Sequence, residues 1–177
     1  MDLAIVIFLL GGLFLGWSLG SNDAANVFGT AVGTRMIRFK TAAIVCSLFI
    51  ILGAVISGSG TTETLGKLGA INALPGAFAA CVAAGLSVYI MTKFGLPVST
   101  TQAIVGAIVG WNLYTGSSTN IKVLLTILST WILCPIIAAL IAMLFFILTK
   151  KLLKNTTWHI LRLDAYTRTA LLIAGAF

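Results

Sequence analysis

Long apolar runs separated by short polar stretches fill this 177-residue chain. Four runs, at 3–32, 41–60, 70–92 and 123–149, are each long enough for a helix that crosses a hydrocarbon core of roughly 30 Å. The stretch 98–111 is also apolar, but about 14 residues make only about 21 Å of helix. That stretch therefore predicts either half of a re-entrant hairpin or a short crossing.

The composition places these helices in a bilayer. Hydrophobic residues make up 59% of the chain, charged residues 8%, and the mean hydropathy is +1.11, whereas soluble domains have about 25% charged residues. Because backbone polar groups in lipid must be satisfied internally, we predict an all-α, polytopic transmembrane bundle. The first run lacks a basic leader, so it does not resemble a cleavable signal peptide.

The basic residues fall between the apolar runs, as in loops on the inner side of a membrane. The net charge of +7 is therefore no sign of nucleic-acid binding. Five crossings with the N-terminus outside fit this distribution. If 97–112 is re-entrant, the number of crossings changes from odd to even. We expect a multi-pass protein of the plasma membrane that contacts lipid.

Nothing in the sequence favours an enzyme. The three cysteines lie far apart inside apolar runs and His159 stands alone, so there is no nucleophile–histidine pair and no metal-ligand spacing. We predict a protein that is not an enzyme, with no cofactor and no metal other than a possible Na⁺.

A polar cluster interrupts the first run at 20–23. Asp23 lies there with Asn22 and Asn26 beside it and no Lys or Arg for about ten residues on either side, and an unpaired carboxylate at membrane depth costs roughly 3 kcal/mol. Since glycine ends helices and Ser or Asn begins them, we predict a broken helix here. An aqueous loop between two short apolar pieces is the alternative.

A second polar cluster, Ser99, Thr100 and Thr101, opens the short apolar stretch. Ser99 and Gln102 have capping-box spacing, so a helix is expected to begin there. A helix N-terminus offers unpaired N–H groups and a partial positive charge, which favours an oxyanion site. Helix capping alone is the simpler interpretation.

A carboxylate repels a bound anion, so the negative charge of Asp23 has to be neutralised if an anion binds beside it. Na⁺ or H⁺ could neutralise the carboxylate, with Asn22 and Asn26 as oxygen ligands. Alternatively, Asp23 could accept a hydrogen bond from protonated phosphate, which sulfate could not imitate at neutral pH. Either arrangement makes anion binding depend on a cation or proton, as in secondary transporters with discontinuous helices.

Other features concern packing and boundaries. Gly29 and Gly33, like Gly106 and Gly110, form G-x-x-x-G pairs that predict close helix packing. Polar residues at 61–67 and 115–122 predict loops. We divide the chain into a first transmembrane repeat, 1–164, and the start of a truncated next segment, 165–177.

Two motifs resemble those of the Pit-type inorganic phosphate transporters. The sequence G-S-N-D-A-A-N-V-F-G at 20–29 resembles the family's G-x-N-D-x-A-N-x-x-G signature, and P-V-S-T-T-Q-A-I-V-G-A at 97–107 resembles its P-V-S-T-T-H-x-I-V-G-A segment. Members of the family have two inverted repeats and move phosphate with Na⁺ or H⁺. The resemblance therefore implies the N-terminal half of such a transporter.

The same resemblance implies site residues and partners. The resemblance implies that Asn22, Asp23, Asn26, Ser99, Thr100 and Thr101 contact phosphate and the coupling ion. With Ser21 as an added donor, we predict phosphate binding by Ser21, Asn22, Asp23, Ser99, Thr100 and Thr101, and cation coupling by Asp23, Asn22, Asn26 and Thr101. The chain is expected to pair with a second repeat or a second copy, as a homodimer. Gln102 replaces a frequent histidine and Ser21 a common alanine. The alternatives are a sulfate permease of the same family and a non-transporting membrane scaffold subunit.

Overall fold

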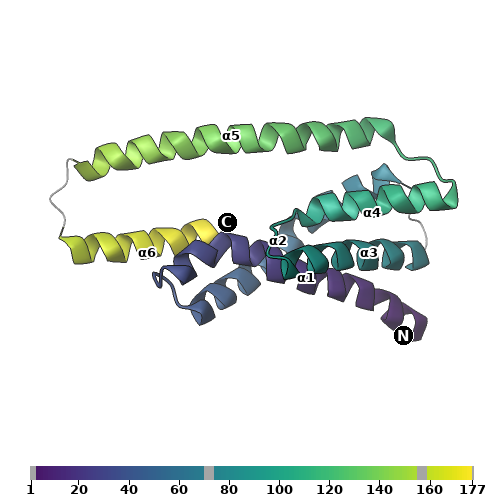
Figure 1. The fold of residues 1–177 in the computed structure, drawn as a ribbon, viewed down its shortest axis with the longest axis horizontal. Helices are drawn as coiled ribbons and strands as arrows, with labels where there is room; N and C mark the ends of the chain where they lie inside the picture. The colour runs from purple at the N-terminus through teal and green to yellow at the C-terminus, as the bar shows by residue number, and fades with distance from the viewer. Residues whose placement is uncertain (1–2, 70–73, 155–158, 177) are drawn as a thin grey trace.

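The computed structural model describes residues 3–69, 74–154 and 159–176, and the regular structure in these ranges is helical throughout. The helices are α1 (Leu3–Gly33), α2 (Phe39–Leu68), α3 (Leu74–Lys93), α4 (Thr100–Thr115), α5 (Ile121–Lys154) and α6 (Ile160–Ala176) (Figure 1). Four of these described helices, α1, α2, α3 and α5, are long and apolar enough to cross a membrane. The predicted all-α transmembrane fold is therefore confirmed.

Helix α1 continues without interruption through residues 20–23, so the predicted break is wrong. Two of the polar side chains here form hydrogen bonds while their backbone stays helical. The Ser21 hydroxyl donates to the Ser18 carbonyl at 2.8 Å, and the Asn22 amide reaches Thr92 of α3. Because these side chains are satisfied, the backbone can keep its helical hydrogen bonds, which are the favourable arrangement in lipid.

Helix α2 also extends further than expected, and the predicted loop at 61–67 is wrong. Thr62 and Thr64 donate their hydroxyl protons to carbonyls four residues earlier in the helix. Glu63 and Lys67 form an exposed ion pair at i,i+4 spacing, which supports a helix. Polar residues therefore continue α2 where composition alone indicated a loop.

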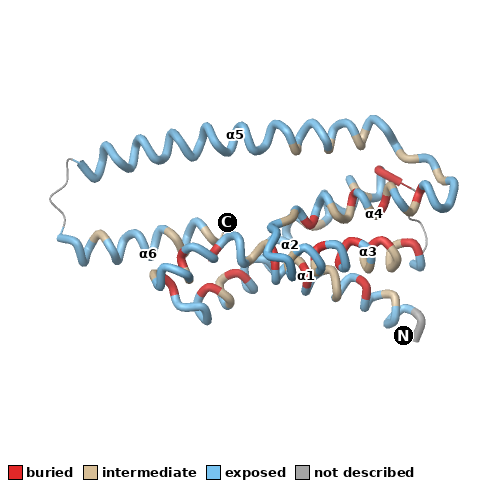
Figure 2. The backbone as a smooth tube through the Cα atoms, in the orientation of Figure 1, coloured by how far each residue is buried: buried red, intermediate tan, exposed pale blue. Residues whose placement is uncertain are grey.

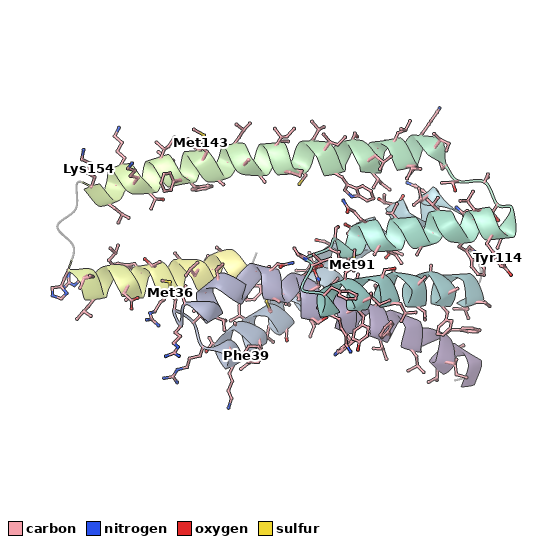
Figure 3. All side chains as sticks on the ribbon, in the orientation of Figure 1. Met36, Phe39, Met91, Tyr114, Met143 and Lys154 are labelled. Atoms are coloured by element: carbon pink, nitrogen blue, oxygen red, sulfur yellow. The ribbon has the colours of Figure 1, made fainter. Side chains whose placement is uncertain are left out.

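Helices α3 and α4 form a hairpin that does not extend along the whole of α1. Pro75 is the second residue of α3, where a helix accepts proline, and Gly95 makes the turn after α3 with φ 70°. The turn region meets α1 at Asn22 and Asp23, about 15 Å before the end of α1 at ten residues of 1.5 Å. Figure 3 accordingly shows Met91, in the last turn of α3, far from Met36 beyond the end of α1.

The buried apolar residues form two clusters. One joins α1 and α2 around Phe28, Ala31 and Cys46, with Leu171 and Leu172 of α6 packed against it. The other joins α2, α3 and α4 around Leu68, Ala80 and Ile108. Helix α5 has no buried residue among those described, and Figure 2 shows it exposed along most of its length.

The C-terminal apolar run, 170–177, belongs to a longer element than the sequence suggested. Its described residues are the second half of α6, which begins at Ile160, and Phe177 lies outside the described residues. The predicted loop at 115–122 is largely confirmed, because α4 ends at Thr115 and α5 begins at Ile121.

The close packing of α1 against α3 depends on Gly85. A Cβ atom placed there would lie 2.7 Å from the Phe14 ring and 3.4 Å from the Leu15 backbone, and the buried Ser18 hydroxyl donates to the Gly85 carbonyl at 3.1 Å. The predicted G-x-x-x-G contacts are not formed between the described residues. Apart from the adjacent backbone of its own helix, no described atom lies within 4 Å of a Cβ placed at any of those four glycines.

We expect Gly85→Leu to destabilise the protein by about 1–3 kcal/mol, because an added side chain in a packed interface forces the helices apart. Thermal unfolding in detergent, followed by circular dichroism, measures the effect. Gly16→Leu is the matched control, since no described atom lies within 4 Å of a Cβ at that α1 glycine. Equal melting temperatures for the two variants would contradict this account of the interface.

Candidate functional site

The N-terminus of α4 begins at Ser99, as the capping-box spacing predicted. The Ser99 hydroxyl accepts a hydrogen bond from the Gln102 backbone N–H at 3.4 Å, with Ser99 itself in an extended conformation. The Ser99 and Thr101 hydroxyls are exposed and lie 2.8 Å apart. The first turn of α4 therefore presents two hydroxyls and the positive end of a helix dipole.

The Thr100 hydroxyl donates to the Asp23 carboxylate, with 3.0 Å between Oγ1 and Oδ2. Thr100 is buried and Asp23 is half-buried. The two residues are 77 positions apart in the sequence, so the fold alone brings them together. The predicted convergence of Asp23 with the second polar cluster is present in the structure.

Asp23 has no basic partner among the described residues, where the two ion pairs are Lys67–Glu63 and Arg168–Asp164. The residue also lines a cavity of about 380 Å³ with residues of α2 and with Gly175 and Ala176 of α6. A carboxylate that is half-buried, unpaired and adjacent to a cavity is able to attract a cation. The hydroxyl of Thr100 stabilises its charge without cancelling it.

Asn22 holds the turn of the hairpin against α1. Its side-chain Nδ2 donates to Thr92 Oγ1 at 2.8 Å, and its Oδ1 accepts from the Val98 backbone N–H at 3.4 Å and from Asn26 Nδ2 at 3.3 Å. Only 4% of Asn22 is exposed. Both ends of this amide are therefore engaged within the protein.

The structure does not bring all the predicted site residues together. Ser21 lines a separate cavity of about 580 Å³ between α1 and α2, and its hydroxyl bonds within α1. Because α1 is continuous, no helix begins at 20–23, and the helix N-terminus that the predicted break would have placed beside Asp23 is not formed. One helix N-terminus, that of α4, lies beside the unpaired acid.

Sequence reasoning missed Thr92, the residue to which Asn22 donates. Thr92 is half-buried in the last turn of α3 and also donates its own proton to the Val88 carbonyl at 2.8 Å. The available signal was a hydroxyl near the end of an apolar run, directly before Lys93. That pattern is common at helix ends and does not indicate a partner 70 residues away.

The described residues contain no group of three or more His, Cys, Asp or Glu side chains that could hold a metal ion. A cation at Asp23 would therefore take its remaining ligands from neutral oxygens, such as amide, hydroxyl or backbone carbonyl groups. Oxygen ligands of this kind suit a hard cation rather than a transition metal.

Apolar helices around a half-buried acid and a helix N-terminus define a multi-pass membrane protein. The sequence model of the phosphate transporter family matches residues 19–174. The chain belongs to this family, which is one of transporters and not of enzymes.

Individual relatives agree with this assignment. A protein of Thermococcus kodakarensis, named as a candidate phosphate permease, is 38% identical over 88% of this chain and 41% of its own length. The inorganic phosphate transporter 2-1 of Arabidopsis thaliana chloroplasts is 31% identical over 78% of this chain and 25% of its own length.

A solved structure titled as the sodium-dependent phosphate transporter also matches. It superposes with a TM-score of 0.74 at 27% identity, over 98% of this chain and 53% of that one. The chain thus spans about half of this solved structure and at most about two fifths of the relatives named above.

We expect Ser99→Ala to destabilise the first turn of α4 by about 1 kcal/mol, because the Gln102 N–H loses its capping oxygen. Amide hydrogen exchange of residues 100–103 measures the loss, and exchange there should accelerate about fivefold, corresponding to 1 kcal/mol. Ser99→Thr retains a capping hydroxyl and should exchange like the wild type. Unchanged exchange in Ser99→Ala would show that this cap contributes nothing.

Proposed function

We propose that this chain is part of a secondary active transporter that carries inorganic phosphate across the plasma membrane together with Na⁺. The contact between the Thr100 hydroxyl and the Asp23 carboxylate is the observation that supports this proposal most directly. It joins the N-terminus of α4, suited to an oxyanion, to an acid suited to a cation.

In this proposal, phosphate binds at the first turn of α4. The unpaired N–H groups of that turn donate to phosphate oxygens. One of the Ser99 and Thr101 hydroxyls donates as well, since the proton of the other is used between these two oxygens. Thr100 keeps its hydroxyl on Asp23 and contributes its backbone N–H. The positive end of the α4 dipole favours the anion without a lysine or arginine.

Asp23 makes phosphate binding depend on a cation. Without a bound cation, the Asp23 carboxylate repels phosphate. A cation held by oxygens of Asp23, Asn26 and Thr101 would attract it. Asn22 would act mainly by holding the hairpin turn, because both ends of its amide are already engaged. By linkage, phosphate must raise the affinity for the cation as much as the cation raises the affinity for phosphate.

Two observations favour Na⁺ over H⁺ in this proposal. The solved relative is titled as sodium-dependent. In addition, Gln102 follows the hydroxyl cluster, where a histidine would have provided a group that titrates near neutral pH. The second repeat and the homodimer also remain predictions, and they would supply protein to cover the exposed α5.

We expect Asp23→Asn to reduce Na⁺-driven phosphate uptake by about 5- to 150-fold, the range of typical coupling free energies. The measurement is uptake of labelled phosphate into phospholipid vesicles that contain the full-length protein, with an imposed Na⁺ gradient at equal pH. A pH gradient without Na⁺ tests H⁺ as the coupling ion in the same vesicles.

Asp164→Asn is the matched control, since Asp164 is an exposed carboxylate on α6 paired with Arg168. Surface ion pairs of this kind contribute little to stability, so uptake should equal that of the wild type. Undiminished uptake in Asp23→Asn would exclude Asp23 as the coupling group.

We expect sulfate to compete poorly with phosphate, by about tenfold or more in concentration. Beside a cation, the two oxygens of the Asp23 carboxylate still have lone pairs that can accept a hydrogen bond from protonated phosphate. Sulfate has no proton to donate at neutral pH, and a missing hydrogen bond to a charged group costs about 1.5–3 kcal/mol. Inhibition of labelled phosphate uptake by added sulfate measures the difference. Equal competition would favour the sulfate permease.

A further inference from the structure

Thr92 lies outside both polar clusters and nevertheless contacts the residue that organises the site. Its hydroxyl oxygen accepts from Asn22 Nδ2 at 2.8 Å and donates to the Val88 carbonyl at 2.8 Å. Because the hydroxyl proton is used within α3, the oxygen can only accept from Asn22. Thr92 therefore fixes which end of the Asn22 amide faces α3.

The opposite end of that amide faces the start of α4. Asn22 Oδ1 accepts from the Val98 backbone N–H at 3.4 Å, and this contact requires the oxygen, not the nitrogen, on that side. One side chain on α1 thus binds both ends of the turn that joins α3 to α4. A rotated amide would present a donor to the Val98 N–H, which is also a donor.

The position of the Val98 backbone sets the position of Thr100, the hydrogen-bond partner of Asp23. Val98 is two residues before Thr100, whose hydroxyl donates to Asp23, and Asp23 directly follows Asn22 in α1. A displaced turn would move Thr100 away from Asp23 and would move the first turn of α4 with it.

We propose that Thr92 is a positioning residue for phosphate binding, which acts by orienting Asn22 so that Val98 and the N-terminus of α4 are held at Asp23. This inference rests on the proposed phosphate transport. Thr92 itself does not contact the proposed site, and its effect passes through Asn22 and the hairpin turn.

The test compares Thr92→Val with Thr92→Ser in the full-length protein in phospholipid vesicles. Valine keeps the shape of threonine but cannot accept from Asn22, whereas serine can. Ser87→Ala is the control for losing a hydroxyl on α3, since Ser87 bonds only to the Ala83 carbonyl of its own helix among the described contacts.

A weakened hold on the turn lowers the fraction of molecules competent to bind, and apparent affinity falls by that fraction. Thr92→Val should therefore raise the KM for phosphate between threefold and tenfold, with the maximal rate per molecule within twofold of wild type. Thr92→Ser and Ser87→Ala should keep the wild-type KM. An unchanged KM in Thr92→Val, or a lower maximal rate at unchanged KM, would overturn the inference.

Amide hydrogen exchange provides a readout that does not require transport. The Val98 N–H should exchange at least threefold faster in Thr92→Val than in wild type, and at the wild-type rate in Thr92→Ser. If the wild-type protein moved no phosphate, the proposed function would fail while faster Val98 exchange would still support the positioning by Thr92. Unchanged Val98 exchange would refute that positioning whatever the transport result.

Discussion

A single hydrogen bond, from the Thr100 hydroxyl to the Asp23 carboxylate, joins the half-buried acid of α1 to the N-terminus of α4. An isolated carboxylate at membrane depth costs roughly 3 kcal/mol. A hydrogen bond to a charged group contributes about 1.5–3 kcal/mol, so one hydroxyl can offset much of that cost. The acid is tolerated without a basic residue, and its negative charge remains available.

The neutral hydroxyl partner of Asp23 matters for the proposed transport. A lysine or arginine beside Asp23 would neutralise it permanently and leave no reason for a cation to enter. Here the hydrogen-bond donor to Asp23 is the neutral hydroxyl of Thr100, the first residue of α4. In the proposed transport, an anion and a cation are then favoured together, because each offsets the charge that repels the other.

The sequence predicted the start of α4 well, but it predicted poorly where a helix continues without a break. The start of α4 at Ser99 was predictable because capping involves only residues three apart. The breaks expected at 20–23 and 61–67 were wrong, because Ser and Thr can continue a helix when their hydroxyls bond to carbonyls of the same helix, as those of Ser21 and Thr62 do. Tertiary contacts, such as Asn22 with Thr92, add to this effect.

The amino-acid sequence by itself determined that the chain belongs in a membrane, that its helices are apolar, and that an acid and three hydroxyls are its exceptional polar groups. These properties follow from composition and from short-range spacing. Only the tertiary structure decided that Thr100 is the residue that reaches Asp23, that Ser21 faces elsewhere, and that Asn22 serves the hairpin turn. Hydrogen bonds between residues some 70 positions apart depend on how helices pack, and packing leaves no local pattern in the chain.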